Sequence, residues 1–250
     1  MLLSRIAKNC LDIVLPPCCV ICGVRISSQG TGKICDSCGS GIRYLAAPFC
    51  RVCGIEVSGA GGYKPLCGEC LTNQPPYSIA RSVVWYEQQI QQLVQKLKYG
   101  RDLSVIPGIL ELIAHYDMAE FADIDCIVVV PLYLRRLRWR GLNQAAVLAR
   151  LFFADRLALI KVDWLIRTRN TVPQTKLGRT ARRENLRGAF QTRAISNFQG
   201  MCVCLVDDVY TTGTTVKECS KVILRSGASE VRVLTLARVD ISHRGRLLGS

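Results

Sequence analysis

Apolar and polar positions alternate with two different periods over residues 78–130. Residues 78–86 and Cys126–Val130 are mainly apolar, which is typical of strands buried in a sheet. Between them, 88–98 and 104–116 carry apolar side chains at helical spacing. The pattern therefore predicts a strand, two helices and a second strand.

The alternation of strands and helices continues toward the C-terminus. Cys202–Val206 and Val231–Ala237 are apolar and strand-like, and the helical stretch 215–226 between them stops at Gly227. This order implies a parallel sheet with right-handed crossovers, so the predicted fold class is α/β. Before these elements we expect an Arg-rich loop at 131–141, a helix over 143–158, a strand at 164–166 and a long polar segment over 167–188.

The first 75 residues lack this periodicity and contain most of the cysteines. Eight of the fourteen cysteines form four Cys-x-x-Cys pairs. One pair presents two thiolates to a metal ion and two pairs complete a tetrahedral site, so the spacing predicts two structural Zn²⁺ ions. Joining consecutive pairs gives two tandem zinc ribbons, and interleaved pairing is also compatible with the spacing. The predicted ligands are Cys19, Cys22, Cys35, Cys38, Cys50, Cys53, Cys67 and Cys70.

The contrast between the two parts predicts the domain organisation. We expect a small double zinc-ribbon module over 1–75, with an N-terminal helix at 2–15, and an α/β domain over 76–250. Lys8 and Asp12 interrupt the apolar run of the first helix, which argues against a signal peptide. Apolar runs also stay shorter than the ~20 residues of a membrane-spanning helix. Together with metal-type cysteine spacing, this indicates a cytoplasmic protein without membrane insertion.

Positive charge is concentrated in the middle of the predicted α/β domain. The chain has a formal net charge of +14, and residues 131–190 hold fourteen Arg or Lys side chains against three acids. Such an excess favours a polyanionic ligand: a phosphate, a pyrophosphate or a nucleic acid. A basic surface that only contacts solvent is the alternative interpretation.

The stretch from Val203 to Thr215 carries the most specific chemistry. Four apolar residues form a buried strand, Asp207 and Asp208 follow at its carboxyl end, and a Thr/Gly turn leads into a helix. Backbone N–H groups, threonine hydroxyls and the helix N-terminus suit a terminal phosphate. The carboxylates offer acceptors to sugar hydroxyls and ligands to Mg²⁺. Open parallel sheets bind ligands at this edge, so we predict a Mg²⁺-assisted phosphosugar site there.

The same stretch matches the motif with which type I phosphoribosyltransferases bind 5-phosphoribosyl pyrophosphate (PRPP). The resemblance implies that Thr211–Thr215 cradle the 5-phosphate and that Asp207 and Asp208 contact the ribose hydroxyls. It also implies a type I phosphoribosyltransferase-like domain with PRPP and Mg²⁺ as ligands.

Further segments resemble the ComF/GntX family. Val130–Leu132 followed by Arg135–Gln144 looks like its pyrophosphate loop and following helix, and residues within 167–190 resemble its flexible loop. The four cysteine pairs and Leu97–Gly100 also fit. The residues implied as catalytic are Asp207, Asp208, Arg135 and Arg136; those implied to bind the ligand are Val206, Asp207, Asp208, Thr211, Thr212, Gly213, Thr214, Thr215, Pro131 and Leu132.

Two functions are compatible with this resemblance. The first is a ComF-type protein that binds PRPP with Mg²⁺ and acts in natural competence, handling single-stranded DNA together with DNA-uptake proteins. The second is a catalytically active phosphoribosyltransferase in nucleotide or base salvage, which breaks the bond at ribose C1 and releases pyrophosphate. A base-recognition hood would favour the second, and none is recognisable in the sequence. Whether the protein turns over PRPP, and with which acceptor, stays open at this point.

Overall fold

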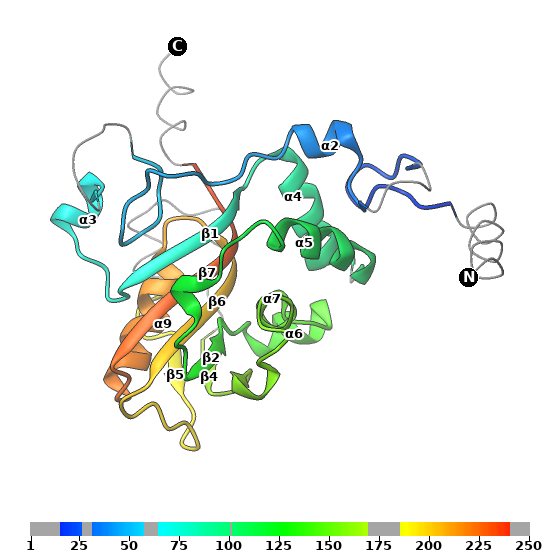
Figure 1. The fold of residues 1–250 in the computed structure, drawn as a ribbon. Coiled ribbons are helices and arrows are strands. Elements are labelled where there is room, and N and C mark those ends of the chain that lie inside the picture. The colour runs from blue at the N-terminus through cyan, green and yellow to red at the C-terminus, as the bar shows by residue number, and fades with distance from the viewer. Residues whose placement is uncertain (1–15, 27–31, 58–64, 101, 170–185, 241–250) are drawn as a thin grey trace, which may run out of the picture.

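The computed structural model describes residues 16–26, 32–57, 65–100, 102–169 and 186–240. At its centre is a five-stranded sheet with the order β1-β7-β6-β2-β3, in which all neighbouring strands are parallel (Figure 1). This sheet confirms the predicted α/β class. Its strands are β1 (Ile79–Trp85), β2 (Cys126–Val129), β3 (Ile160–Lys161), β6 (Cys202–Tyr210) and β7 (Glu230–Arg238).

Both faces of the sheet are covered, because its central strands are apolar on both sides. In β6, Val203 and Leu205 belong to one apolar cluster, whereas Cys204 and Val206 belong to the cluster on the opposite face. The second face is covered by α4 (Gln88–Gln95), α5 (Ile106–Ile113) and α7 (Gln144–Phe152). The first is covered by α9 (Thr214–Arg225) and by a small antiparallel sheet of β4 (Leu165–Arg167) and β5 (Phe190–Thr192).

Short helical elements complete the described part of the chain. The π-helical turn η1 (Lys96–Gly100) continues α4 directly. The 3₁₀ turns are η2 (Leu103–Val105), η3 (Ala119–Phe121) and η4 (Leu157–Leu159). The one-turn helices are α2 (Asp36–Ser40) and α3 (Gly68–Thr72).

The Arg-rich segment differs from the sequence-based prediction, which was wrong in treating 131–141 as a loop. Leu134–Arg140 form helix α6, because a run of Leu and Arg has high helix propensity. Gly141 ends this helix in the left-handed conformation, with φ 76°. The arginines therefore lie on a helix that starts just beyond the carboxyl end of β2.

Two further boundaries also differ from the prediction. The helix expected over 143–158 ends at Phe152, and the chain turns at Phe153, whose ring is fully buried. Strand β6 continues past Val206 to Tyr210, because β7 stays paired with it as far as the Tyr210–Arg238 register. The two acids therefore lie within the last part of a strand.

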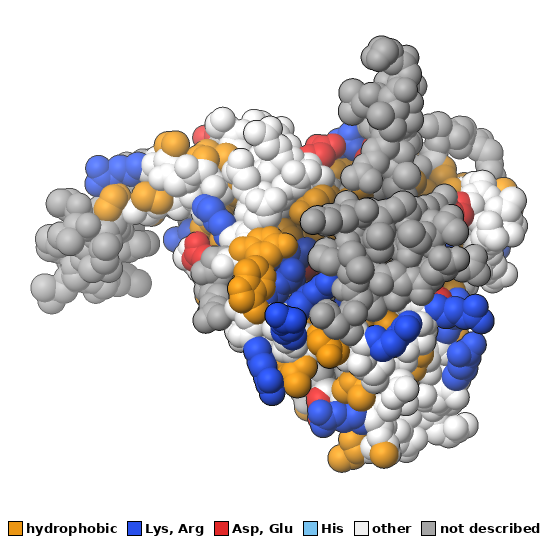
Figure 2. Space-filling view, turned by 180° about the vertical axis from the view of Figure 1, so that it is seen from behind, with side chains coloured by type: hydrophobic (Ala, Val, Ile, Leu, Met, Phe, Trp, Pro, Cys, Tyr) orange, Lys and Arg blue, Asp and Glu red, His pale blue; other side chains and the backbone are white. Residues whose placement is uncertain are grey.

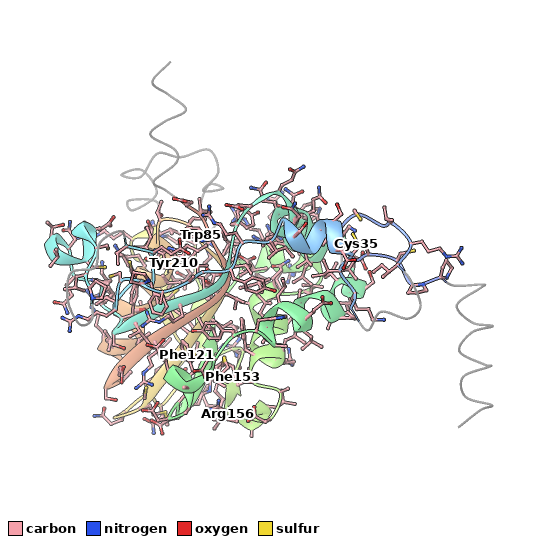
Figure 3. The ribbon with its side chains drawn as sticks, turned by 45° about the horizontal axis from the view of Figure 1, so that its top comes forward. Cys35, Trp85, Phe121, Phe153, Arg156 and Tyr210 are labelled. Carbon is pink, nitrogen blue, oxygen red and sulfur yellow. The ribbon has the colours of Figure 1, made fainter. Side chains whose placement is uncertain are left out.

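The two cysteine-rich parts lie at opposite ends of the molecule (Figure 1). The first contains α2 and lies beside α4 and α5, and the second contains α3. In Figure 3, Cys35 of the first part lies far from Tyr210 at the end of β6. The expected double zinc ribbon is thus realised as two separate ribbons, whereas the domain boundary at residue 75 stays a prediction.

The segment that joins the ribbons runs antiparallel along the edge strand β1. Leu45 N donates to Val83 O at 3.2 Å, and Trp85 N donates to Arg43 O at 2.9 Å. Tyr44 forms a β-bridge with Val84 between these two hydrogen bonds. The outer edge of β1 is therefore partly paired.

Two predictions fall on other parts of the chain. The helix at 2–15 and residues 170–185 of the polar segment lie outside the described residues. Within the ranges that the structure describes, no helix is long and apolar enough to cross a membrane.

Candidate metal centres and ligand site

The four Cys-x-x-Cys pairs form two clusters of four thiols. In each cluster the four Sγ atoms lie within 4.8 Å of one another. Each cluster contains two consecutive pairs, so the sequential pairing is observed and the interleaved one is not. The clusters are Cys19, Cys22, Cys35 and Cys38, and Cys50, Cys53, Cys67 and Cys70.

The geometry and chemistry of both clusters fit zinc. Cys35 and Cys67 each precede a one-turn helix, α2 and α3, and adopt extended backbone angles there. Burial raises the pKa of the Cys38 and Cys70 thiols, so a cation is needed to hold four thiolates together. Four sulfur ligands within reach of one ion suit tetrahedral Zn²⁺ in a closed, structural site.

Each ribbon is attached to the α/β domain through backbone carbonyls. In the first, Lys96 Nζ donates to Val20 O at 2.7 Å and to Ile21 O at 2.9 Å. In the second, the buried guanidinium of Arg238 donates to Cys53 O. Since Lys96 belongs to η1 and Arg238 ends β7, each ribbon contacts a different element of the domain.

A cavity of about 240 Å³ opens at the carboxyl ends of β2 and β6. Eight of the residues predicted to act here line it: Pro131, Leu132, Arg136, Asp207, Asp208, Thr211, Gly213 and Thr215. Four others do not line it. Arg135 is exposed on α6, Val206 is fully buried in the core, and Thr212 and Thr214 line a second cavity.

The two adjacent acids have different surroundings. Asp208 Oδ2 lies 2.8 Å from Lys98 Nζ, which η1 supplies. Burial and the neighbouring charge of Asp208 raise the pKa of Asp207 to about 7. Burial opposes the charge on Lys98, but the carboxylate of Asp208 outweighs it and raises the pKa of Lys98. The site therefore holds one ion pair beside a carboxyl group that resists ionisation.

Three arginines bring excess positive charge to the same cavity. Arg136 and Arg140 come from α6, and Arg167 comes from β4. Burial, with repulsion from Arg140, lowers the pKa of Arg136; burial, with repulsion from Arg136, lowers that of Arg167 to about 10. With Lys98 the cavity has four cationic side chains and two acidic ones. Cations that repel one another in a partly buried site favour an anionic ligand.

The turn between β6 and α9 has a geometry suited to an anion. Gly213 precedes α9 with φ 71°, and a Cβ at this position would collide with the phenol of Tyr210. The Tyr210 hydroxyl lies 2.6 Å from the Tyr77 hydroxyl, and the Arg238 guanidinium lies 4.2 Å from the centroid of the Tyr210 ring. Tyr210 therefore packs against the turn, and Gly213 and Thr215 at the N-terminus of the twelve-residue α9 line the cavity.

Several lining residues have no role in the sequence-based site. Lys98 and Tyr99 are signalled only by the resemblance of Leu97–Gly100 to the family. Asn143 accepts a hydrogen bond from Ala145 N at 3.1 Å as the N-cap of α7, and donates to Val130 O at 3.1 Å. An Asn two residues after a helix-ending glycine is a recognisable N-cap signal, but its bond to the end of β2 is visible only in the fold.

Comparisons with known proteins agree with this architecture. A family model described as a double zinc ribbon domain matches residues 10–71. The DNA utilization protein YhgH of Salmonella typhi is 31% identical over 231 residues, which cover 90% of this chain and 99% of that protein. Competence protein F of Haemophilus influenzae is 30% identical over 241 residues, covering 94% and 93%. Competence protein ComFC of Bacillus subtilis is 29% identical over 163 residues, covering 63% of each.

Among solved structures, a purine phosphoribosyltransferase from Pyrococcus horikoshii is 18% identical over 52% of this chain and 70% of its own, with a TM-score of 0.30. A TM-score this low supports no conclusion about this chain. The fold and the cysteine clusters define a double zinc-ribbon protein with a parallel α/β domain and a cationic cavity at the carboxyl edge of its sheet. The chain belongs to the ComF family, which includes these DNA utilization and competence proteins.

Proposed function

We propose that the α/β domain binds PRPP together with Mg²⁺ in the cavity at the carboxyl ends of β2 and β6. The observation that carries this proposal is the meeting of three features in one cavity: adjacent acids, an excess of cations and a helix N-terminal turn. Each suits one part of the ligand, namely the ribose hydroxyls with Mg²⁺, the pyrophosphate and the 5-phosphate.

The individual roles follow from the position of each group. Asp207 and Asp208 offer carboxylate oxygens, which are the ligands that Mg²⁺ prefers. Arg136, Arg140 and Arg167 surround the space in which a pyrophosphate would lie, and guanidinium groups contact phosphate oxygens bidentately. The 5-phosphate would be bound by backbone N–H groups of the Thr211–Thr215 turn.

Thermal unfolding with PRPP and Mg²⁺ tests this proposal. At a ligand concentration about 100-fold above Kd, binding to the folded state adds ~2.7 kcal/mol. For a chain of this size that raises the Tm by roughly 5–10 °C. Asp207→Asn combined with Asp208→Asn should abolish the increase. An increase of the same size in this double variant would place the ligand elsewhere.

The matched control changes two acids that do not line the cavity. Asp155 and Asp163 are 77% and 55% exposed, and their ion pairs with Arg156 and Arg193 are 3.7 and 3.3 Å long. Asp155→Asn combined with Asp163→Asn also removes two acidic groups from the chain. This variant should keep the full PRPP response.

We further propose that the protein handles single-stranded DNA in natural competence, as the names of its relatives, a DNA utilization protein and a competence protein, suggest. The observation that supports DNA binding is the composition of α6, which has no buried residue. Its Trp139 is 66% exposed and lies 5.9 Å, centroid to centroid, from the exposed ring of Tyr99. Arg135 and Arg138 are exposed on the same helix. Exposed aromatic rings among arginines suit stacked bases and a phosphate backbone.

The wider surface is compatible with such a ligand. On the face shown in Figure 2, Lys and Arg side chains gather beside exposed hydrophobic side chains. An extended polyanion needs a surface of this kind in addition to a cavity that takes one pyrophosphate.

A further inference from the structure

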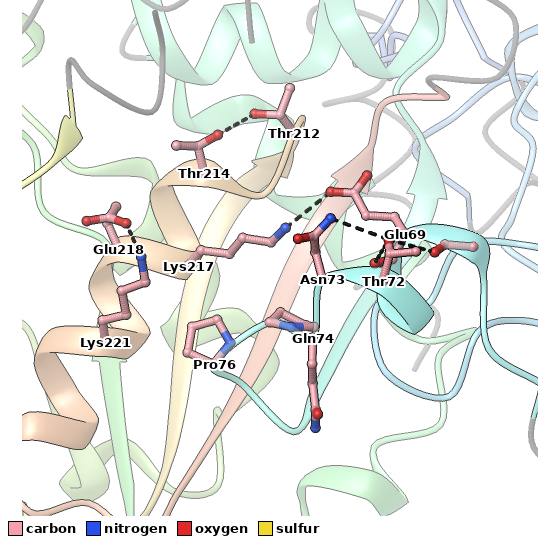
Figure 4. A pocket seen from close by; sticks show the side chains of 12 residues that line it. Glu69, Thr72, Asn73, Gln74, Pro76, Thr212, Thr214, Lys217, Glu218 and Lys221 are labelled. Carbon is pink, nitrogen blue, oxygen red and sulfur yellow. Dashed lines mark hydrogen bonds and ion pairs between the residues drawn. The ribbon is translucent and has the colours of Figure 1, made fainter. Parts of the chain in front are cut away.

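A second and larger cavity, of about 600 Å³, lies on the other side of the Thr/Gly turn (Figure 4). One wall is the second zinc ribbon, through α3 and the segment 73–76 that follows it. The other wall is the first half of α9 together with the turn. The proposed function assigns nothing to this cavity, although the two cavities share the turn.

Charge is balanced in the larger cavity, unlike in the smaller one. Lys217 Nζ lies 3.3 Å from Glu69 Oε1, an ion pair that joins the two walls. Lys221 Nζ lies 2.6 Å from Glu218 Oε1 on α9. Both lysines that line the cavity are thus paired with an acid, and the cavity has no excess charge for a second phosphate group.

The remaining lining groups are neutral and can form hydrogen bonds. Asn73 and Gln74 contribute side-chain amides, each with two donor hydrogens and an acceptor oxygen. Thr72 adds a hydroxyl, and Pro75 with Pro76 adds an apolar surface beside these polar groups. Amides next to a flat apolar surface suit an uncharged polar heterocycle, since amide groups match the edges of nucleobases.

The turn connects the two environments. Thr212 and Thr214 line the neutral cavity, and their hydroxyl oxygens lie 2.8 Å apart, whereas Thr211, Gly213 and Thr215 line the cationic cavity. A phosphate on this turn therefore has a cationic cavity on one side and a neutral, hydrogen-bonding cavity on the other. A 5-phosphate without a second ester group would occupy the cationic cavity and leave the neutral cavity empty.

We infer that the neutral cavity binds the nucleoside esterified to the far side of the phosphate on the turn, so that the whole site accepts a phosphodiester between two nucleosides. This inference rests on the proposed function, because it needs the Thr211–Thr215 turn to bind a phosphate. The nucleoside in the cationic cavity then supplies the 5′-oxygen of the diester. Its neighbour supplies the 3′-oxygen and lies against Asn73 and Gln74.

Two probes of equal charge test the inference by calorimetry on the zinc-loaded full chain. The first is thymidylyl-(3′→5′)-thymidine. The second is the methyl ester of thymidine 5′-phosphate, which keeps the singly charged diester but lacks the second nucleoside. The dinucleoside should bind about tenfold more tightly, a difference of ~1.4 kcal/mol. Equal affinities would overturn the inference.

A double variant assigns the gain to the cavity. Asn73→Ala with Gln74→Ala should reduce the affinity for the dinucleoside to that of the methyl ester, while the methyl ester and PRPP bind as before. The matched control, Gln92→Ala with Gln95→Ala, removes two exposed amides from α4 and should change neither affinity. An unchanged preference in the Asn73/Gln74 variant would overturn the inference.

The PRPP measurement separates this inference from the proposed function. If PRPP binds while the two thymidine probes bind equally, only the phosphodiester inference fails. If neither PRPP nor either probe binds to the folded, zinc-loaded chain, the proposed phosphate site fails and the inference fails with it.

Discussion

Asp207 and Asp208 are neighbours in sequence, yet they have different electrostatic environments. Because β6 continues through both, their side chains leave the strand on opposite sides. Asp208 meets Lys98 from η1, whereas Asp207 interacts with Arg167 and with the buried Cys219 of α9. Asp208 forms the ion pair with Lys98, whereas burial of Asp207 and the neighbouring charge of Asp208 raise the pKa of Asp207 to about 7.

A first residue-scale prediction concerns Lys98. In Lys98→Gln, Asp208 loses a cation whose Nζ lies 2.8 Å away, in a pair whose side chains are 19% and 15% exposed. The variant should therefore have a free energy of unfolding lower by roughly 1–3 kcal/mol, and it should unfold at a lower temperature than the wild type. Mg²⁺ alone should restore part of the loss, because a divalent ion can take the place of the ammonium group.

The control for this prediction is Lys33→Gln, which changes an exposed lysine. Its Tm should be close to that of the wild type, and Mg²⁺ should not raise it. If Mg²⁺ stabilises Lys98→Gln no more than it stabilises Lys33→Gln, the cation does not bind beside Asp208.

A second residue-scale prediction concerns the pH dependence of stability. The pKa of Asp207 is raised from 3.8 to about 7 in the folded chain. Between these values the folded state binds more protons than the unfolded state, so this carboxyl makes stability fall as pH rises from about 4 to 7. Asp207→Asn removes the effect. The variant should have a clearly higher Tm than the wild type at pH 8 and a much smaller gain at pH 5. A gain independent of pH would contradict this account.

At the scale of elements, the sequence predicts the sheet well and α6 poorly. Short runs such as Cys126–Val130 are apolar at every position, as expected of strands buried on both faces, and the structure confirms this strand as β2. Helix α6 buries none of its residues, and its Leu134, Leu137 and Trp139 are exposed. A helix that packs no apolar face against the core needs no amphipathic pattern, so hydrophobic periodicity does not reveal it. Helix propensity alone would have identified it.

The candidate site was predictable where a motif is continuous in sequence and not where the fold brings distant elements together. Asp207, Asp208 and the Thr/Gly turn follow one another along the chain. Lys98 joins them only because η1 packs over the carboxyl end of β6, and no local pattern in the sequence encodes that contact.

An element-scale prediction distinguishes the two ribbons. Arg238 contacts Cys53 of the second ribbon and stacks on Tyr210, against which Gly213 of the turn lies. Losing the second metal should therefore disorder the turn, whereas the first ribbon has no comparable contact with it among the described residues. Ribose 5-phosphate is the appropriate probe, because its single phosphate reports on the turn.

The comparison uses one cysteine from each cluster. Cys53→Ser and Cys22→Ser should each retain about half of the zinc, measured by metal analysis against two ions per wild-type chain. Ribose 5-phosphate should still raise the Tm of Cys22→Ser and should have little effect on Cys53→Ser. Equal responses from the two variants would show that the contact through Tyr210 does not support the turn.

At the scale of the whole molecule, DNA binding should depend on α6 and on salt. Replacing Arg135, Arg138 and Trp139 by Ala removes two proposed phosphate contacts and one proposed stacking surface, and none of these residues lines the cavity. Affinity for a single-stranded 30-mer should fall about tenfold or more, since one stacked base contributes ~1–3 kcal/mol. The dependence of log K on log salt should also become shallower by roughly 1–2 units.

The control variant, Arg51→Ala with Arg225→Ala, removes two exposed arginines from other elements. It should retain most of the affinity. Fluorescence anisotropy at several salt concentrations measures both quantities. A 30-mer that fails to bind the wild-type chain at low salt would refute DNA binding on this surface.

We expect the hydrogen bonds of residues 43–45 to β1 to protect this strand from pairing with other copies of the chain. β1 is an outer strand of the sheet, and the segment that covers it is held at both ends by a cysteine cluster. The opposite outer strand, β3, has only two residues and offers little to pair with. Chelation of zinc would release the covering segment and uncover the backbone of β1, which other copies of the chain can then extend as a shared sheet. Metal loss should thus appear as aggregation, measurable by light scattering, while the sheet itself is still folded.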